Sequence, residues 1–155
     1  MSDFVLPDEH DREMMRVLNM SRKVLQKLGT YFNENVYRAA LAVELRREGY
    51  ETKEEETFGV KYEGEEVGNI RVDILVSKEE KKYILELKKD VKVVGVQQLI
   101  TYLETADMDY GYIVRFLYND VKIEYVFREK DGNKYKYFHY DGESVRRSYR
   151  GGEHV

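Results

Sequence analysis

Residues 72–89, VDILVSKEEKKYILELKK, place two apolar runs on either side of a charged turn, which is typical of a β-hairpin. Each arm nevertheless carries charged residues where a core strand would have apolar ones. If the turn is Glu79-Glu80, Asp73 of the first arm lies directly opposite Glu86 of the second, with their Cβ atoms about 4.5–5.5 Å apart. This register predicts two facing carboxylates on one side of a sheet.

Such a pair of carboxylates needs a compensating positive charge, because two like charges held this close repel each other. A divalent cation such as Mg²⁺ would supply it, since this ion prefers oxygen ligands and often takes one or two carboxylates together with water and phosphate. Lys88, two residues beyond Glu86, projects from the same face and adds a second cation. In the alternative interpretation the register is shifted, and Asp73 forms a salt bridge with Lys88 or Arg71.

The composition narrows the class of protein. With 155 residues, 42% of them hydrophobic and 36% charged, the chain is long enough for one domain with a real core. The absence of cysteine excludes disulfides, thiolate zinc sites and a cysteine nucleophile, and the three histidines match no metal-ligand spacing. A net charge of −4 does not indicate general affinity for nucleic acid, so such binding would need a local basic patch.

The chain organisation is simple. Residues 1–140 are expected to form a single domain, and residues 141–155 a polar, glycine-rich and flexible tail. No apolar run is long enough to span a membrane, and no leader opens the chain, so we expect no membrane association. The expected location is intracellular: the cytoplasm, or the nucleus if the protein is eukaryotic or viral.

Two helices are predicted in the first third of the chain. Apolar spacings of three and four residues indicate an amphipathic helix over residues 8–28, ended by Gly29. A second helix is predicted over residues 31–48, with Gly49 at its end. The apolar face expected for this second helix consists of Phe32, Val36, Ala39, Ala40 and Val43.

Glu34 stands apart from that face. It lies in line with Tyr37, Leu41 and Leu45, at steps of three, four and four residues, so its carboxylate borders an apolar stripe. The simplest explanation is an acid in the first turn that interacts favourably with the helix dipole. The alternative is a functional carboxylate that faces a site on the sheet.

The rest of the chain alternates between strand and helix patterns. Residues 57–77 and the hairpin read as strands, residues 93–106 return to helical spacing, and three short strands follow over residues 110–140. Two helices, a strand meander, one helix and further strands indicate an α/β fold of the α+β sandwich type.

The charged residues of the hairpin also form a known pattern. Asp73 followed by Glu86-Leu87-Lys88 resembles the acid, acid-x-lysine core of the PD-(D/E)XK nuclease superfamily. Further elements, in order over residues 14–128, are similar to its GxxExxY branch: Gly29, Glu34 and Tyr37; Tyr62, Gly64 and Gly68; Gln98 and Tyr102; and the strand YGYIVRF at residues 110–116. The chain departs from the branch at Tyr31, where a second glycine is frequent, and at Arg115, where asparagine is usual.

The resemblance implies a restriction-endonuclease-like core, in which N-terminal helices pack on a mixed, mainly antiparallel central sheet and a further helix follows the catalytic hairpin. It also implies a metal-dependent nuclease that uses Mg²⁺ or Mn²⁺. The implied metal ligands are Asp73, Glu86, the backbone carbonyl of Leu87 and Glu34. The implied role of Lys88 is to orient or activate the attacking water.

The implied catalytic set is Asp73, Glu86, Lys88, Glu34, Gln98 and Tyr102. Gln98 and Tyr102, four residues apart on a helix, can face one pocket together. The implied partner is nucleic acid, with DNA favoured over RNA, and a homodimer is left open. The alternative is a non-catalytic module of the same fold that binds nucleic acid or protein.

A basic and aromatic segment, residues 128–140, is the candidate surface for nucleic acid. Its cations could meet phosphates and its tyrosines could stack on bases. The favoured alternative is a surface hairpin whose tyrosines pack across strands. The residues concerned are Arg128, Lys130, Lys134, Lys136, Tyr135, Tyr137 and Tyr140. The segment RRSYR, residues 146–150, is a second candidate for phosphate contacts.

Overall fold

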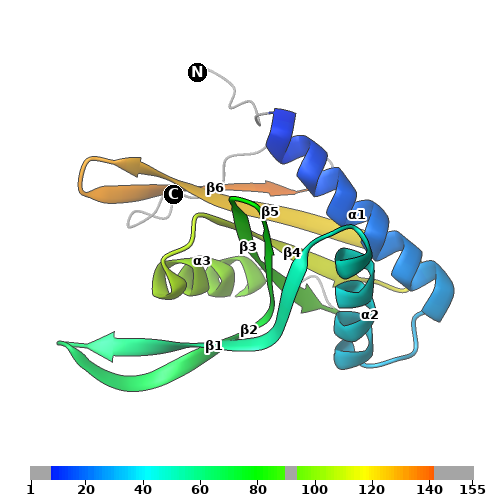
Figure 1. The fold of residues 1–155 in the computed structure, drawn as a ribbon, viewed down its shortest axis with the longest axis horizontal. Coiled ribbons are helices and arrows are strands. Elements are labelled where there is room, and N and C mark those ends of the chain that lie inside the picture. Colours follow the sequence, from blue (N-terminus) through cyan, green and yellow to red (C-terminus); the bar gives the residue numbers. More distant parts are fainter. Residues whose placement is uncertain (1–7, 90–93, 142–155) are drawn as a thin grey trace.

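The computed structural model describes residues 8–89 and 94–141, which form one sheet covered by helices on both faces (Figure 1). Almost all of the predicted tail, from residue 142 on, lies outside the described residues, and so does the segment RRSYR. The elements in chain order are α1 (Asp8–Leu28), α2 (Glu34–Arg47), β1 (Glu51–Tyr62), β2 (Glu65–Lys78), β3 (Lys81–Lys88), α3 (Val94–Ala106), β4 (Tyr110–Phe116), β5 (Val121–Asp131) and β6 (Lys134–Asp141).

The six strands lie in the sheet in chain order, β1 to β6. All neighbouring strands are antiparallel except β3 and β4, which are parallel. Parallel neighbours cannot be joined by a tight turn, and the chain crosses between them through α3. The predicted α+β sandwich, with a mixed and mainly antiparallel sheet and a helix after the hairpin, is confirmed.

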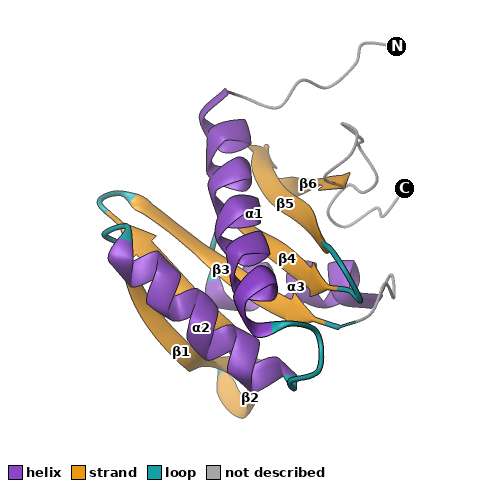
Figure 2. Ribbon diagram, turned by 90° about the vertical axis from the view of Figure 1, so that its right-hand side faces the viewer, coloured by secondary structure: helices purple, strands orange, loops and turns teal. Residues whose placement is uncertain are grey.

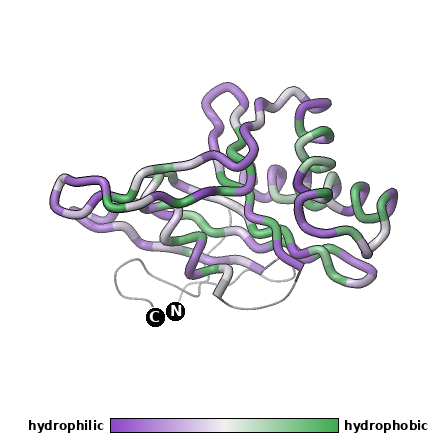
Figure 3. The backbone as a smooth tube through the Cα atoms, turned by 90° about the horizontal axis from the view of Figure 1, so that it is seen from below, coloured by the Kyte–Doolittle hydropathy of each residue, from purple (hydrophilic) through white to green (hydrophobic). Residues whose placement is uncertain are grey.

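The core has two parts, one on each face of the sheet. Helices α1 and α2 cover the first face, where residues such as Ile74, Leu85 and Val114 are buried. Helix α3 covers the other face, over residues such as Ile84 and Ile113 (Figure 2). In Figure 3 the hydrophobic residues gather where the helices meet the sheet, whereas the hairpin tips are hydrophilic. Within residues 8–89 and 94–141, every helix is too short or too polar to form a transmembrane segment.

Helix α1 confirms the predicted stripe, but α2 corrects the prediction in two respects. It begins at Glu34 rather than at residue 31, and its buried face is Tyr37, Leu41, Ala42 and Leu45. The face predicted from the other apolar residues is wrong, because Phe32 lies before the helix and both Phe32 and Val43 are exposed. Tyr37, Leu41 and Leu45 bury more area than the alanines of the alternative face, which decides the orientation. The line that begins with Glu34 is therefore the one that faces the sheet.

Gly111 allows α3 to pack closely on the parallel strands. A Cβ atom at this position would lie 2.8 Å from the carbonyl oxygen of Ile84 and 3.0 Å from Cδ1 of Leu99. The first neighbour is backbone of β3 and cannot move without disturbing the sheet. Glycine is therefore required for the contact between β4, β3 and α3.

Substitution Gly111→Ala should lower the free energy of unfolding by about 1–3 kcal/mol, as overpacked core sites do. The control is Gly68→Ala, in a strand where an added Cβ has no atom within 4 Å. That change should be neutral or slightly stabilising. Urea unfolding of both variants measures the difference. Equal stability of the two variants would contradict the packing described here.

Candidate active site

The predicted register of the β2–β3 hairpin is confirmed. Ile74 pairs with Leu85, and the two strands turn at Glu79-Glu80. One step further along the same register, Asp73 and Glu86 face each other. Side chains of Leu75 and Ile84, which also pair, lie on the α3 side of the sheet, so the carboxylates project toward α3 as well. The alternative of a shifted register is therefore wrong.

At Asp73 and Glu86 the carboxylates accept hydrogen bonds from the backbone of the opposite strand. The backbone N–H of Asp73 donates to Oε2 of Glu86 over 2.8 Å, and the backbone N–H of Leu87 donates to Oδ2 of Asp73 over 2.7 Å. Each strand thus binds the acid of the other strand. This arrangement fixes both carboxylates, whose charges repel, within a short distance of each other.

Burial makes this repulsion costly. Glu86 is buried and Asp73 is half-buried. Burial and then the charge of Asp73 raise the pKa of Glu86 to about 8, against the opposing effects of the Asp73 N–H and Lys88. Burial likewise raises the pKa of Asp73, although the Leu87 N–H and Lys88 oppose it. The pair therefore holds a proton near neutral pH unless another positive charge takes its place.

The donor set suits a divalent cation. One oxygen of each carboxylate, Oδ1 of Asp73 and Oε1 of Glu86, accepts no hydrogen bond from the described residues. Two carboxylate oxygens beside bound water match the preferences of Mg²⁺. Among residues 8–89 and 94–141, however, the structure does not gather three His, Asp or Glu side chains into one metal-binding group.

Strands β1 and β2 bend next to Asp73. In the β1–β2 register Glu55 falls opposite Asp73, between the pairs Glu54–Ile74 and Glu56–Val72. Glu55 has φ of +54°, a conformation that is costly for a residue other than glycine. Figure 1 shows both strands curving here and continuing beneath α3. The carboxylate pair lies where the β1–β2 ribbon leaves the body of the sheet.

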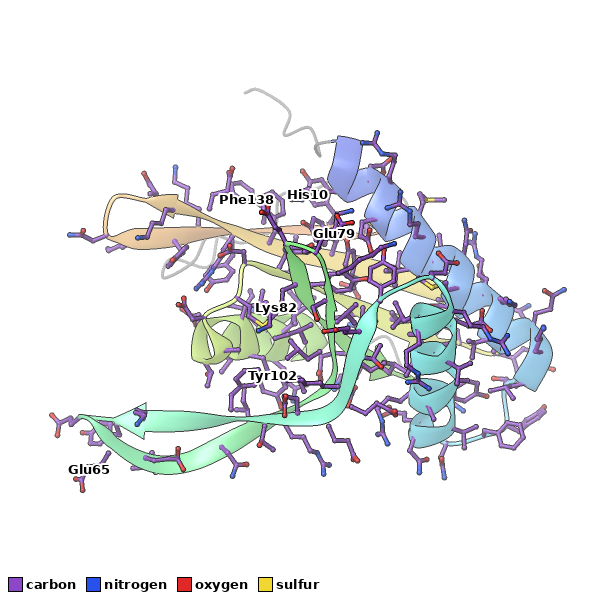
Figure 4. All side chains as sticks on the ribbon, viewed as in Figure 1. His10, Glu65, Glu79, Lys82, Tyr102 and Phe138 are labelled. Carbon is purple, nitrogen blue, oxygen red and sulfur yellow. The ribbon has the colours of Figure 1, made fainter. Side chains whose placement is uncertain are left out.

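Helix α3 contributes two side chains, Gln98 and Tyr102, that lie near the acids and Lys88. Nζ of Lys88 donates to Oε1 of Gln98 over 2.9 Å, so this helix contacts the lysine of the hairpin. Tyr102 follows one turn later and is half-buried. Burial raises its pKa, and the charges of Glu86 and Asp73 raise it further, which places the phenol near both acids. In Figure 4 its side chain lies between α3 and the β1–β2 ribbon.

Glu34 and Leu87 occupy the border of the site. Glu34 is the first residue of α2 and is exposed, and its charge contributes to the raised pKa of Glu86. It therefore lies near enough to the acid pair for its charge to act on Glu86, without joining the pair in a three-carboxylate group of the described residues. The side chain of Leu87 is buried in the core, and its N–H holds Asp73.

Two arginines near the site were not predicted as site residues. Arg38 and Arg71 both lower the pKa of Asp73 through their charges. Arg38 follows Glu34 by four residues on α2, and Arg71 precedes Asp73 by two on β2, so same-face spacing could have identified both. Both arginines also pair with Glu55, at 3.7 and 3.5 Å.

A third arginine, Arg115, lies beside Lys88. Arg115 pairs with Lys88 in the parallel register of β3 and β4, and it is buried. Its Nε donates to Glu124 over 2.5 Å, and Glu124 also contacts Nε2 of His139 over 2.5 Å. Burial favours a raised pKa for Glu124, but hydrogen bonds from His139 and Arg115 hold that pKa below its usual value. The departure at Arg115 thus introduces a buried ion pair next to the site.

Hydrogen bonds hold the loop between α1 and α2 in place and join it to the end of β3. The Tyr37 hydroxyl donates to the carbonyl oxygen of Gly29 over 2.5 Å and accepts from the N–H of Phe32 over 3.3 Å. Lys89, next after Lys88, donates to the carbonyl oxygens of Thr30 and Phe32 over 2.9 and 2.6 Å. These contacts fix the loop that leads into Glu34.

The segment of residues 128–140 does not form the predicted stacking surface. Tyr137 and Tyr140 are buried, so the alternative of packing within the fold is confirmed for them. The guanidinium of Arg128 lies 3.8 Å from the centre of the Tyr135 ring and pairs with Asp107 and Asp109, at 2.7 and 3.2 Å. Lys136 pairs with Asp131 over 3.3 Å. Of the predicted cations, Lys130 and Lys134 are exposed.

Comparison with known proteins gives the family. Residues 11–126 match the PD-(D/E)XK nuclease superfamily, and the chain belongs to this superfamily. The mixed sheet and its helices are consistent with the restriction-endonuclease-like fold of that group. Neither the curated proteins nor the solved structures gave a significant match. Membership suggests a nuclease-type function and a nucleic-acid substrate.

The raised pKa of Glu86 predicts how stability depends on pH without metal. The folded state holds the proton up to about pH 8, whereas the ordinary pKa is 4.5. Stability contributed by the protonated form is therefore complete below the ordinary pKa and is lost as the pH rises through the folded value. In EDTA, urea unfolding should show a falling free energy of unfolding from about pH 5 to about pH 9, by at most about 1.4 kcal/mol per pH unit.

Glu86→Gln should flatten this dependence, because the amide keeps an oxygen for the Asp73 N–H and carries no charge. The matched control is Glu66→Gln, which changes an exposed carboxylate on β2 and should leave the slope as it is. A slope that persists in Glu86→Gln would show that another group causes it.

Proposed function

We propose that the protein is a metal-dependent nuclease that hydrolyses phosphodiester bonds of DNA or RNA. The observation that carries this proposal is the pair of carboxylates, the half-buried Asp73 and the buried Glu86, beside Lys88 in a chain of the PD-(D/E)XK superfamily. Asp73 and Glu86 would hold Mg²⁺ or Mn²⁺. When bound there, the ion lowers the pKa of its water and polarises the phosphate.

Lys88 would act on the water or on the scissile phosphate. Its ammonium lies on the same sheet face as the two acids and is held by Gln98 at 2.9 Å. An ammonium placed in advance stabilises the negative charge that develops on the phosphoryl oxygens in the transition state. Because Gln98 accepts a hydrogen bond from one N–H of the ammonium, the remaining N–H groups can be directed toward the substrate.

The remaining site residues would have supporting roles. Glu34 and the backbone carbonyl of Leu87 are proposed as further metal ligands, and Tyr102 as a phenol beside the scissile group. The Glu34 proposal rests on its place at the start of α2, near enough to Glu86 to raise that pKa. We also propose that the chain belongs to the GxxExxY branch and that DNA is the preferred substrate. Assembly as a homodimer remains a prediction.

Cleavage requires Lys88 in this proposal. With Mg²⁺ or Mn²⁺, purified protein should cut nucleic acid, EDTA should stop the reaction, and Lys88→Ala should lower the rate by roughly 100-fold or more, as loss of one transition-state donor does. The assay uses single- and double-stranded DNA and RNA, linear and circular, so cutting of circles identifies an endonuclease. Lys82→Ala, an exposed lysine of the same strand, serves as control and should retain full activity.

Metal-independent cleavage, or cleavage unchanged in Lys88→Ala, would contradict the proposal. A folded protein that binds metal and cuts none of these substrates would instead favour a non-catalytic module of the same fold.

Metal binding should also be visible without catalysis. Mn²⁺ at about 100 times its Kd stabilises a folded protein by about 2.7 kcal/mol, which corresponds to a rise in Tm of about 5–10 °C for a chain of this size. Asp73→Asn should lose most of this rise, whereas Glu66→Gln should keep it. Differential scanning calorimetry with and without Mn²⁺ makes the comparison. Equal metal-induced shifts in Asp73→Asn and the parent would exclude Asp73 as a ligand.

A further inference from the structure

Three aromatic side chains are exposed on one rim of the site. Tyr31 and Phe32 lie in the loop between α1 and α2, and Tyr118 lies in the loop between β4 and β5. Tyr31 is 87% exposed, Phe32 47% and Tyr118 73%. Aromatic side chains that cluster on an exposed surface are typical of a binding site. None of the roles proposed above uses them.

The two loops are joined to each other. Oγ1 of Thr30 donates to the carbonyl oxygen of Leu117 over 3.3 Å, so the residues just before Tyr31 and Tyr118 are in contact. In Figure 2 both loops lie at the same end of the sheet. The hydrogen bond of Tyr37 to Gly29 restrains the first loop further. The aromatic rings are thus carried on a backbone that is fixed in advance.

The rim is also joined to the catalytic strand. Lys89 holds the carbonyl oxygens of Thr30 and Phe32, and its neighbour in the chain is Lys88. Consecutive Cα atoms are about 3.8 Å apart, so Lys89 joins the loop to β3 at the residue next to Lys88. Glu34 follows the loop directly. Because consecutive side chains of a strand project to opposite faces, Lys89 reaches the loop from the face opposite Lys88. A strand of nucleic acid with its phosphate at Lys88 would reach these rings by passing around the end of β3.

A hollow of about 370 Å³ lies between the end of α1 and the β4–β5 loop, with Tyr118 on its wall. Its lining includes Gln26, Asn119 and Arg22, whose Nε pairs with Asp120 over 3.3 Å. Amide side chains can hydrogen-bond the edges of bases. Lys27, in the last turn of α1, is exposed near the start of the loop and can meet a phosphate.

We propose that Tyr31 and Tyr118 form a platform on which unpaired bases stack, and that the substrate is consequently single-stranded, or has an unpaired end, next to the scissile phosphate. This inference rests on the nuclease function proposed above and names its substrate class. Base faces are open for stacking only when a strand is unpaired, and each stacked base contributes to affinity without sequence preference. A net charge of −4 is unfavourable for binding along the phosphates of a long duplex.

The test measures binding apart from cleavage. Fluorescence anisotropy of a labelled single strand and of its blunt duplex is measured with Mg²⁺ in the Lys88→Ala background. Tyr31→Ala and Tyr118→Ala should each weaken binding of the single strand by roughly 5- to 100-fold and leave the weak duplex binding unchanged. Tyr31→Phe and Tyr118→Phe should retain the affinity, because stacking needs only the ring.

The matched control is Tyr62→Ala. Tyr62 is 66% exposed but lies at the end of β1, in the hairpin that extends away from the sheet, and its removal should not change binding. All of these side chains are largely exposed, so their variants should fold, and equal melting temperatures verify this. An equal loss in Tyr62→Ala, or no loss in the rim variants, would overturn the platform.

The outcomes separate the two proposals. Metal-dependent cleavage by the parent protein without any effect of the rim variants on affinity overturns the platform and leaves the nuclease in place. Tyrosine-dependent binding of single strands by a protein that cleaves nothing supports the platform and overturns the nuclease. If the rim variants change the mass in analytical ultracentrifugation and not the affinity, the rings belong to a contact between copies of the chain, and the platform is overturned.

Discussion

The constraint on which the site depends is the exchange of hydrogen bonds between two acids and two strands. Asp73 and Glu86 each accept a hydrogen bond from a backbone N–H of the opposite strand. This keeps two like charges together in a buried place. Burial and the charge of Asp73 together raise the pKa of Glu86 to about 8, so the pair favours a bound proton or another positive charge. The bend of β1 and β2 lies next to this pair, and Lys88, which contacts Gln98, lies on the same face of the sheet.

Much of this arrangement could be predicted from the sequence because it depends on short-range rules. The turn at Glu79-Glu80 fixes the register of the hairpin, and the register fixes which residues face each other. The helical step from Gln98 to Tyr102 likewise places both on one side of α3. Helix α2 shows the limit of such rules. Two apolar faces competed there, and only contact with the sheet selects the one with Tyr37 and Leu41.

Other features depend on contacts between distant elements and leave no local pattern. The φ of Glu55, the burial of Tyr137 and the ion pair of Arg115 with Glu124 are set by neighbouring strands. The exposure of the aromatic residues of the α1–α2 loop could not be predicted from the sequence either, because Phe32 fitted the pattern of an amphipathic helix. The family motif identified Gly29 and Tyr37, and their hydrogen bond explains in part why this spacing matters.

The parallel pairing of β3 with β4 also sets an order of assembly during synthesis. Both acids and Lys88 belong to a local hairpin, which can form as soon as that segment leaves the ribosome. Gln98, which holds Lys88, and Arg115, which pairs beside it, arrive only after α3 and β4 have been made. Long-range parallel pairing is slow to form. A nascent chain therefore carries the two acids before it carries the groups that position Lys88, and the complete site exists only after β4 has been made.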